Sequence, residues 1–256
     1  MLIAIGSQGS SPGVSTLALA LAGFWPTDAA TVVVEADPAG GDMKSWQRVP
    51  GEPGLGALAT AARHSADPAT VFAHASALPG GLNVVTAPEG PDQASAAVQL
   101  LARDGAGLLR ALSADQAITV LDLGRLDPAS STLDLLAYAD LTLIVARPNL
   151  AEITRLAARI ATIKQYARDP EAVSLVLSGT GYPADAVAES QQTPVLAVLP
   201  RDEACAGVLS GSLTMRRGLD RTRLARAART LGHVVIQRQG ALVSANARPV
   251  SKEADA

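Results

Sequence analysis

Short apolar runs recur along the chain, each bounded by glycine, proline or aspartate. They are rich in leucine and β-branched residues and have the length of buried strands. The runs are Leu2–Ile5, Thr31–Glu35, Leu82–Val85, Ile118–Leu123, Leu141–Ala146, Ala172–Leu177 and Val195–Leu199. Stretches with helical spacing lie between most of them, at Thr16–Ala22, Gln93–Arg103, Ser131–Tyr138, Leu150–Tyr166 and Leu219–Leu231. This alternation predicts a doubly wound α/β fold, in which a mostly parallel sheet of about seven strands is flanked by helices.

The pattern is weaker in two regions. Residues 50–79 are rich in alanine, glycine and proline, which indicates short helices. After Gly232 the helical periodicity fades. We therefore expect the domain to span residues 1–232, and residues 233–256 to form a C-terminal tail that is flexible at least from residue 244.

Composition narrows the classes of function. With 256 residues and 48% hydrophobic content the chain can bury one sizeable core, and a net charge of −3 gives no general attraction to nucleic acid or anionic lipid. A single cysteine, Cys205, excludes an intrachain disulfide and a cysteine-built metal site. We expect a cytoplasmic protein, because no run is long enough to span a membrane and no basic residue precedes the first apolar stretch.

The segment GSSPGVST, Gly9 to Thr16, lies between the first apolar run and the first helical stretch. A strand that turns through a glycine-rich loop into a helix directs backbone N–H groups and the positive helix end at one point, which can bind an anion. Gly9 and Gly13 permit a close turn, and Ser15 and Thr16 stand where hydroxyls would meet Mg²⁺ and a phosphate oxygen. By itself the segment is explained equally well as an ordinary turn, because Val14 stands where a phosphate-binding loop has lysine.

Two further strand ends carry carboxylates. The stretch VVVEADPAGGD, residues 32–42, ends a predicted strand with Glu35 and Asp37 on the same side of an extended chain, followed by glycines that free the backbone to curl around a ligand. The stretch ITVLDLGRLDP, residues 118–128, places Asp122 at the end of another buried strand. Three strand ends with this chemistry favour one ligand site at the carboxyl edge of the sheet.

Together these residues resemble the MinD/ParA family, the SIMIBI-class P-loop ATPases with a deviant Walker A motif. EADPAGGD, residues 35–42, is similar to the family's D-x-D-P-x-G-G/N segment, and Asp122 stands at its Walker B aspartate. ADLTLIVARPNLAEITRL, residues 139–156, is similar to the family's A-D-x-x-x-x-V-x-x-P strand and helix, and VLAVLPRDE, residues 195–203, to its late strand ending in Leu-Pro-x-Asp. The resemblance spans roughly residues 1–232.

The resemblance implies that ATP and Mg²⁺ bind at these positions. The implied phosphate-binding residues are Gly9, Ser10, Ser11, Pro12, Gly13, Val14, Ser15 and Thr16. Ser15 and Asp122 would hold Mg²⁺, and Glu35 or Asp37 would orient an attacking water. The loop that contains Pro200 and Asp202 would border the base.

The chain departs from the family's pattern where the chemistry takes place. Aligning Gly13 with the last loop glycine puts Gly9 at the signature lysine and Val14 at the Walker lysine, so both lysines are missing. The loss of one charged hydrogen bond to phosphate, about 1.5–3 kcal/mol, weakens binding roughly ten- to a hundredfold. Removing a donor that acts in the transition state costs about 10²–10³ in rate. We therefore expect a nucleotide-binding positioning or regulatory switch with weak or absent ATP hydrolysis.

Alternatives remain open. A pseudo-ATPase adaptor would keep the fold and a partner surface but bind no nucleotide. A cation that replaces the missing lysine could come from Arg125, Lys44 or Arg48, although a solvated surface charge is the more ordinary role for each. Alternatively, a partner protein could supply an arginine. A Rossmann dinucleotide site is disfavoured, because the glycines of the first loop lack the G-x-G-x-x-G spacing.

The family resemblance also implies a homodimer and a protein partner or cargo. The stretch Arg216–Arg229 is basic and could contact nucleic acid, but a solvated helix with Leu219, Leu224 and Leu231 toward the core is favoured. No direct membrane anchor is expected, because the C-terminal tail lacks a basic amphipathic helix.

Overall fold

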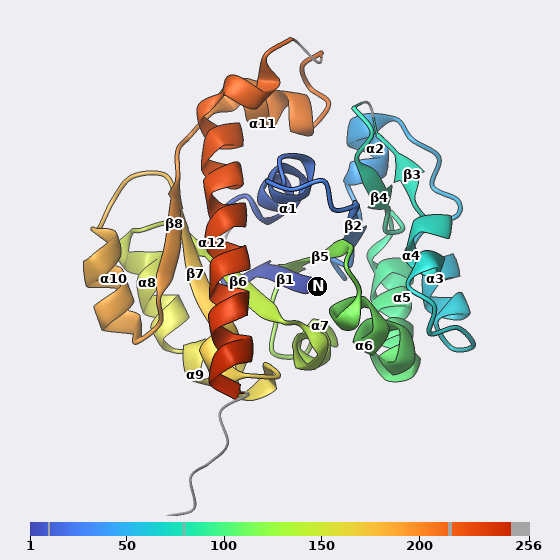
Figure 1. Cartoon of the computed structure of the whole chain (residues 1–256), viewed down its shortest axis with the longest axis horizontal. Coiled ribbons are helices and arrows are strands. Elements are labelled where there is room, and N and C mark those ends of the chain that lie inside the picture. Colours follow the sequence, from blue (N-terminus) through green and yellow to red (C-terminus); the bar gives the residue numbers. More distant parts are fainter. Residues whose placement is uncertain (10, 79, 215–216, 247–256) are drawn as a thin grey trace, which may run out of the picture.

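An eight-stranded sheet forms the centre of the computed structural model, which describes residues 1–9, 11–78, 80–214 and 217–246 (Figure 1). The strands are β1 (Leu2–Ser7), β2 (Thr31–Glu35), β3 (Ser76–Ala77), β4 (Asn83–Val85), β5 (Ile118–Arg125), β6 (Leu141–Ala146), β7 (Val173–Ser178) and β8 (Val195–Leu199). Their order is β3-β4-β2-β5-β1-β6-β7-β8, and every neighbouring pair is parallel except β3 and β4. All seven predicted strands are present, and β3 is an added antiparallel edge strand.

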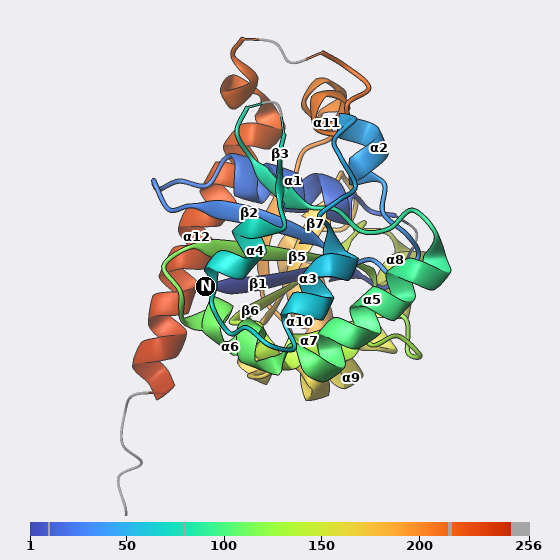
Figure 2. The ribbon, with the colours of Figure 1, turned by 90° about the vertical axis from the view of Figure 1, so that its right-hand side faces the viewer.

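Helices cover both faces of the sheet because successive strand residues point to opposite sides. Leu2 and Ala4 face one core, whereas Ile3 and Ile5 face the other. On the second face lie α1 (Val14–Gly23), α2 (Met43–Gln47), α11 (Glu203–Leu209) and α12 (Arg223–Asn246). On the first face lie α3 (Leu55–Ala61), α4 (Ala69–Ala73), α5 (Pro91–Asp104), α6 (Ala106–Ala114), α7 (Thr132–Leu135), α8 (Leu150–Ala157), α9 (Ile160–Tyr166) and α10 (Ala184–Gln191). Figure 2 views the sheet with α12 on one side and α5 on the other.

Several predicted helices are interrupted by a turn or continued by a short 3-10 turn. The predicted helix at 150–166 is two helices, α8 and α9, and the one at 131–138 is α7 followed by η1 (Leu136–Tyr138). Two further turns are η2 (Pro170–Ala172) and η3 (Leu219–Arg221). The stretch at 50–79 contains the short helices α3 and α4, as predicted.

The last helix is much longer than the sequence pattern indicated. We expected it to end at Leu231, but α12 continues to Asn246 and packs along α1 and β8 (Figure 1). Gly232 does not end the helix; a Cβ at this position would lie 2.5 Å from Cδ of Pro26, so this glycine lets the helix approach the loop after α1. The expected tail therefore begins as helix, and its residues 247–256 lie outside the described part of the chain.

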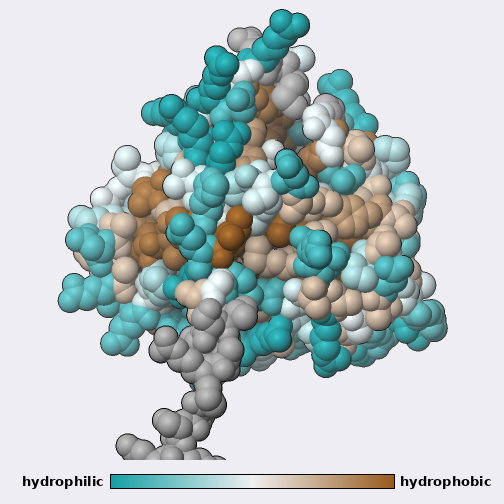
Figure 3. All heavy atoms as spheres, viewed as in Figure 1, coloured by the Kyte–Doolittle hydropathy of each residue, from teal (hydrophilic) through white to brown (hydrophobic). Residues whose placement is uncertain are grey.

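The arginines at the start of α12 lie on its solvent side, while Leu224 and Leu231 are buried in the core. Figure 3 shows hydrophilic side chains gathered over this end of the helix, at the top of the view. Arg216 lies outside the described residues. Within the described segments, no helix combines the length and hydrophobicity that a bilayer crossing requires.

Candidate functional site

The three strand ends singled out in the sequence are neighbours in the sheet. Strand β5 lies between β1 and β2, and Asp122 of β5 is in register with Ile5 of β1 and Glu35 of β2. The loops that follow these strands therefore emerge side by side at the carboxyl edge, where open α/β sheets bind their ligands.

The loop after β1 leads directly into the amino end of α1. Gly13, the residue before the helix, has φ 103° and ψ 37°, and none of the described side chains caps the helix. This left-handed conformation is readily available only to glycine. No described atom lies within 4 Å of the position that a Cβ would occupy at Gly13, so the space in front of the helix is open. Ser10 lies outside the described residues.

Val14 and Pro12 do not project from this loop as exposed side chains. Val14 is 6% exposed and belongs to the core on the α1 face of the sheet. Pro12 is buried, and together with Ser11, Gly13 and Thr16 it lines a groove next to the loop. The valine at the lysine position is therefore directed into the core and supplies no charge.

Asp122 is fully buried and has an oxygen without a partner. Its Oδ1 accepts a hydrogen bond of 3.1 Å from the N–H of Gly124, whereas Oδ2 has no partner among the described residues. Burial raises the pKa of Asp122 to about 7; the Ser15 side chain and the Gly124 N–H oppose this shift, and the charges of Glu35 and Asp37 add to it. A buried, unpaired carboxylate oxygen next to a hydroxyl suits a bound cation.

These residues fit the chemistry of Mg²⁺. Mg²⁺ is usually bound by one or two carboxylates together with phosphate oxygens and water, so it needs few protein ligands. Ser15 and Asp122 supply a hydroxyl and a carboxylate at one place. In the described part of the chain, no group of three or more His, Cys, Asp or Glu residues forms a metal site by itself.

Glu35 is buried, and both oxygens of its carboxylate are bound by backbone N–H groups. It is 2% exposed, and its Oε1 accepts hydrogen bonds from the N–H groups of Asp42 (2.8 Å) and Met43 (3.0 Å). Its Oε2 accepts one of 2.9 Å from the N–H of Ala87, just after β4. Burial raises the pKa of Glu35, and these three hydrogen bonds partly offset the rise. The longer side chain thus ties the ends of β2 and β4 together, which argues against the catalytic role expected for it.

Asp37 is half-buried, so its carboxylate is more accessible to a ligand than that of Glu35. Its Oδ1 accepts a hydrogen bond of 2.8 Å from the N–H of Ala39. Burial raises its pKa, with the charge of Asp42 adding to the shift and the Ala39 N–H and the charge of Arg125 opposing it. Its negative charge also raises the pKa of Asp122. Of the two predicted catalytic carboxylates, the geometry leaves Asp37 as the candidate.

A groove of about 1200 Å³ runs beside the loop along the carboxyl edge. The segments that line it follow four neighbouring strands, at residues 11–17 after β1, 147–149 after β6, 178–180 after β7 and 200–203 after β8. Pro200 and Asp202, which the resemblance places beside the base, line this groove, and so does Ser178 at the end of β7.

Asp202 also holds two helices together. Its Oδ1 accepts a hydrogen bond of 3.1 Å from the N–H of Cys205 in α11, and its Oδ2 accepts one of 3.0 Å from the N–H of Leu224 in α12. Burial would raise the pKa of Asp202, but the N–H groups of Leu224, Cys205 and Arg223 and the Arg223 charge together lower it. This capping role was not predicted from the sequence.

No hydrogen bond or ion pair joins the cations that the sequence proposed as substitutes to the described residues of the loop. Lys44 forms an ion pair of 3.6 Å with Glu89, Arg48 ends α2, and Arg125 is exposed at the end of β5. Sequence reasoning missed Arg147, whose guanidinium donates a hydrogen bond of 3.1 Å to the carbonyl of Ser11. The signal that could have found it is its position directly after β6, the strand next to β1.

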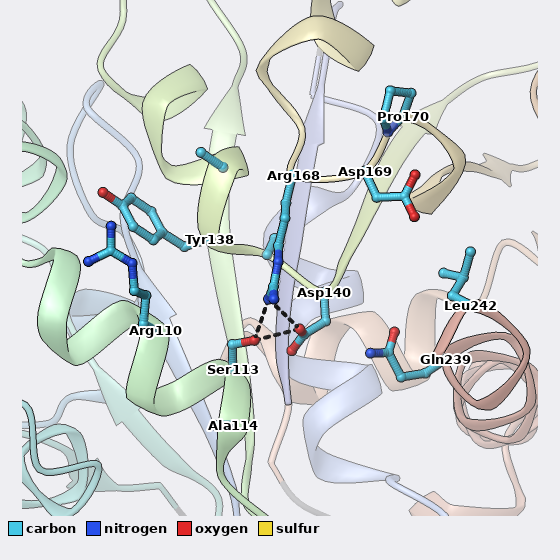
Figure 4. A pocket seen from close by; sticks show the side chains of 12 residues that line it. Arg110, Ser113, Ala114, Tyr138, Asp140, Arg168, Asp169, Pro170, Gln239 and Leu242 are labelled. Atoms are coloured by element: carbon cyan, nitrogen blue, oxygen red, sulfur yellow. Dashed lines mark hydrogen bonds and ion pairs between the residues drawn. The ribbon is translucent and has the colours of Figure 1, made fainter. Parts of the chain in front are cut away.

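A second hollow, of about 890 Å³, lies at the opposite, amino edge of the sheet (Figure 4). Three of its polar side chains bond to one another: Asp140 accepts hydrogen bonds from Ser113 (2.5 Å) and the N–H of Leu2 (2.8 Å), and Arg168 contacts both Asp140 and Ser113. Oε1 of Gln239, which also lines the hollow, has no partner among the described residues. Arg110 stacks over the ring of Tyr138, 5.6 Å from its centre. These groups hold the amino ends of the strands in place, so the carboxyl edge is the candidate ligand site.

No protein-family model matches the sequence, and no curated protein matches it. Solved structures do match its fold. The cell division ATPase MinD of Pyrococcus furiosus superposes with a TM-score of 0.72 at 16% identity, covering 93% of this chain and 98% of that one. MinD of Pyrococcus horikoshii OT3, complexed with Mg-ADP, gives 0.71 at 14% identity, covering 94% and 97%.

A ParA family ATPase from Chlorobium tepidum TLS is similar to the same extent, with a TM-score of 0.70 at 15% identity and coverage of 91% of this chain and 97% of that one. Each match covers nearly the whole of both chains, so the likeness includes the sheet and the helices on both of its faces. At these identities the likeness concerns the fold alone. The chain has the P-loop NTPase fold of the MinD and ParA ATPases.

Proposed function

We propose that this protein is a MinD/ParA-like nucleotide-binding switch, with a degenerate Walker A loop and weak or absent ATP hydrolysis. The observation that carries the proposal is the buried, unpartnered Oδ2 of Asp122 beside Ser15, beneath an uncapped helix end that opens onto a groove. An isolated buried carboxylate is unfavourable in water-free surroundings, so a site of this kind is best explained by a cation that completes it.

In this proposal different parts of the site bind different parts of the nucleotide. The amino end of α1 and the loop from Gly9 to Thr16 would bind the phosphates through backbone N–H groups. Ser15 and Asp122 would hold Mg²⁺, which neutralises charge on the phosphates when bound. The segments at Ser178 and Pro200 would face the base, since both line the groove away from the loop.

Hydrolysis is expected to be slow because neither lysine of the family's loop is present. Such lysines stabilise charge that develops during phosphoryl transfer, and losing one donor typically costs about 10²–10³ in rate. Asp37 remains the carboxylate that could orient a water, whereas Glu35 is engaged by three backbone N–H groups. Nucleotide binding without fast turnover suits a positioning or regulatory protein in the cytoplasm.

The switch would act as a homodimer and through a protein partner or cargo, as the family resemblance implies. Nucleic acid binding through the arginines of α12 is a weaker proposal, because Leu224, Ala225, Ala228 and Leu231 account for the helix as a packing element. We propose no membrane anchor.

A pseudo-ATPase adaptor that binds no nucleotide is the second candidate. The observation in its favour is Val14, which is packed into the core at the position of the phosphate-binding lysine. Such a protein would keep the fold and a partner surface and would have no use for Mg²⁺.

Equilibrium titration of the full chain with a fluorescent ATP analogue separates the two candidates. The switch predicts saturable binding that Mg²⁺ strengthens, and Asp122→Asn should abolish the Mg²⁺ effect. Asp134→Asn is the matched control, because Asp134 is an exposed aspartate on α7. Absence of saturable binding by the unmodified protein, with or without Mg²⁺, would establish the adaptor instead.

A further inference from the structure

We infer that Arg147 binds the nucleotide phosphates and supplies the positive charge that Val14 cannot; this inference rests on the proposed function. The topology places it for that role. Strand β6 is parallel to β1 with Ser7 in register with Val145, so the residue two positions beyond Val145 emerges at the level of the loop after β1.

The side chain of Arg147 already contacts this loop. Its Nη2 donates a hydrogen bond of 3.1 Å to the carbonyl of Ser11, and it lines the groove together with Ser11, Gly13 and Thr16. A guanidinium presents its donors in a planar fork that matches phosphate oxygens, so it binds phosphate in two-pronged fashion. The charge therefore reaches the phosphate site from the neighbouring strand instead of from the first turn of α1.

Glu152 holds Arg147 in this position before any ligand arrives. Oε1 of this carboxylate lies 3.6 Å from Nη1 of Arg147, and Oε2 accepts a hydrogen bond of 2.7 Å from the Arg147 backbone N–H. Glu152 is 5% exposed and is fixed at the start of α8, where its own N–H donates to the Asn149 side chain. A phosphate must compete with this carboxylate for the guanidinium, so Glu152 limits the affinity of the site.

The other arginines near the groove are less well placed. Arg201 and Arg223 also line the groove, but neither is hydrogen-bonded to a described residue of the loop; Arg201 pairs with Glu203 at 3.2 Å, and Arg223 donates to the carbonyl of Arg201. Arg155 lies beside the loop, with Nη1 3.8 Å from the position of a Cβ at Gly9, but it does not belong to the groove lining. Arg155 is therefore a matched control: the same charge near the same loop, outside the groove.

The test is competition binding by the full chain, with unlabelled ATP and adenosine displacing the fluorescent ATP analogue. Arg147→Ala should weaken ATP binding roughly ten- to a hundredfold and leave adenosine binding unchanged, because adenosine has no phosphate. Arg155→Ala should change ATP affinity by less than about threefold. Circular dichroism establishes that each variant is folded.

Glu152→Gln distinguishes a phosphate ligand from a residue that only supports the loop. It removes the competing charge while keeping an acceptor for the Arg147 N–H, so ATP affinity should rise severalfold, and this gain should vanish when Arg147→Ala is added. A merely structural Arg147 gives no such gain. If the unmodified protein binds ATP and Arg147→Ala binds it equally well, or Arg155→Ala is equally weakened, the inference is overturned and the proposed function stands. If the unmodified protein binds no ATP, both are overturned.

Discussion

Individual carboxylates at the carboxyl edge have different tasks, although they look alike in the sequence. Glu35 and Asp37 are two residues apart and end the same strand, yet Glu35 is turned inward to three backbone N–H groups while Asp37 stays half-buried near Asp122. The sequence predicted that these side chains meet, because the carboxyl ends of parallel strands share an edge. It could not predict which carboxylate accepts hydrogen bonds from the backbone, since that depends on how residues 36–43 and Ala87 fold around Glu35.

Glu35→Gln tests the structural role of this carboxylate. The amide group replaces one acceptor oxygen by a donor that faces backbone N–H groups, so we expect the free energy of unfolding to fall by about 2–3 kcal/mol. Urea unfolding measures the loss, and Glu89→Gln is the control, because Glu89 is exposed and its carboxylate contacts Lys44 and the Ser45 hydroxyl at the surface. A variant with unchanged stability and altered nucleotide chemistry would return Glu35 to the catalytic role that the sequence suggested.

Asp122→Asn should make the ligand-free protein more stable at pH 8. The folded-state pKa of Asp122 is raised to about 7 from 3.8, so the folded protein keeps a proton that the unfolded chain loses. Folding therefore loses stability as the pH rises from about 4 to 7, by about 1.4 kcal/mol for each unit of pKa shift, and by a few kcal/mol in total. The measurement is urea unfolding of both proteins at several pH values without Mg²⁺ and nucleotide. Parallel pH profiles for the two proteins would show that Asp122 is not strained by burial.

At the scale of elements, the strands could be predicted from the apolar pattern, whereas the ends of the helices could not. The runs that form β1, β2, β5, β6 and β7 are buried almost throughout, so their hydrophobicity marks them, and the same pattern found β8, an edge strand whose residues are mostly half-buried or exposed. Strand β3 was not predicted because it has only two residues, Ser76 and Ala77, which are too few to show an apolar pattern. Its antiparallel pairing with β4 depends on the turn between the two strands. The continuation of α12 beyond Leu231 escaped notice for a different reason: it is set by packing against α1 and β8, which no local pattern records.

Substituting alanine for two different glycines of α12 should change the stability of the protein in opposite directions. Replacing a helical glycine by alanine ordinarily stabilises a helix by about 0.5–1 kcal/mol, and Gly240→Ala should do so because no described atom lies within 4 Å of its Cβ position. Gly232→Ala should instead destabilise the protein by about 1–3 kcal/mol, because its Cβ would meet the Pro26 ring at 2.5 Å. Thermal unfolding of both variants provides the comparison. Equal stabilisation by the two substitutions would mean that α12 is not held against the loop after α1.

For the molecule as a whole, the two edges of the sheet are built differently. The carboxyl edge has an open helix end, a groove and an unpartnered carboxylate oxygen, whereas Asp140, Ser113 and Arg168 bond to one another at the amino edge (Figure 4). The motifs that resemble those of MinD and ParA lie at the carboxyl edge, so the sequence predicted a site there. Nothing in the sequence pointed to the amino edge, because its residues come from the start of β1, from α6 and α12, and from the loops before β6 and β7, which carry no motif in common.

Asp140→Ala should therefore lower stability without changing the ligand site. Its side chain is 8% exposed and joins the N–H of Leu2, the Ser113 hydroxyl and the Arg168 guanidinium, so truncation leaves buried donors unpaired. We expect a loss of about 2–4 kcal/mol in unfolding free energy. Arg168→Ala should cost less than about 1 kcal/mol, because that side chain is 59% exposed. Nucleotide affinity, measured on protein that is still folded, should be unchanged in both variants, because a rigid sheet separates this network from the groove. An Asp140→Ala protein that is stable but binds nucleotide differently would show instead that the two edges are coupled through β1 and β6.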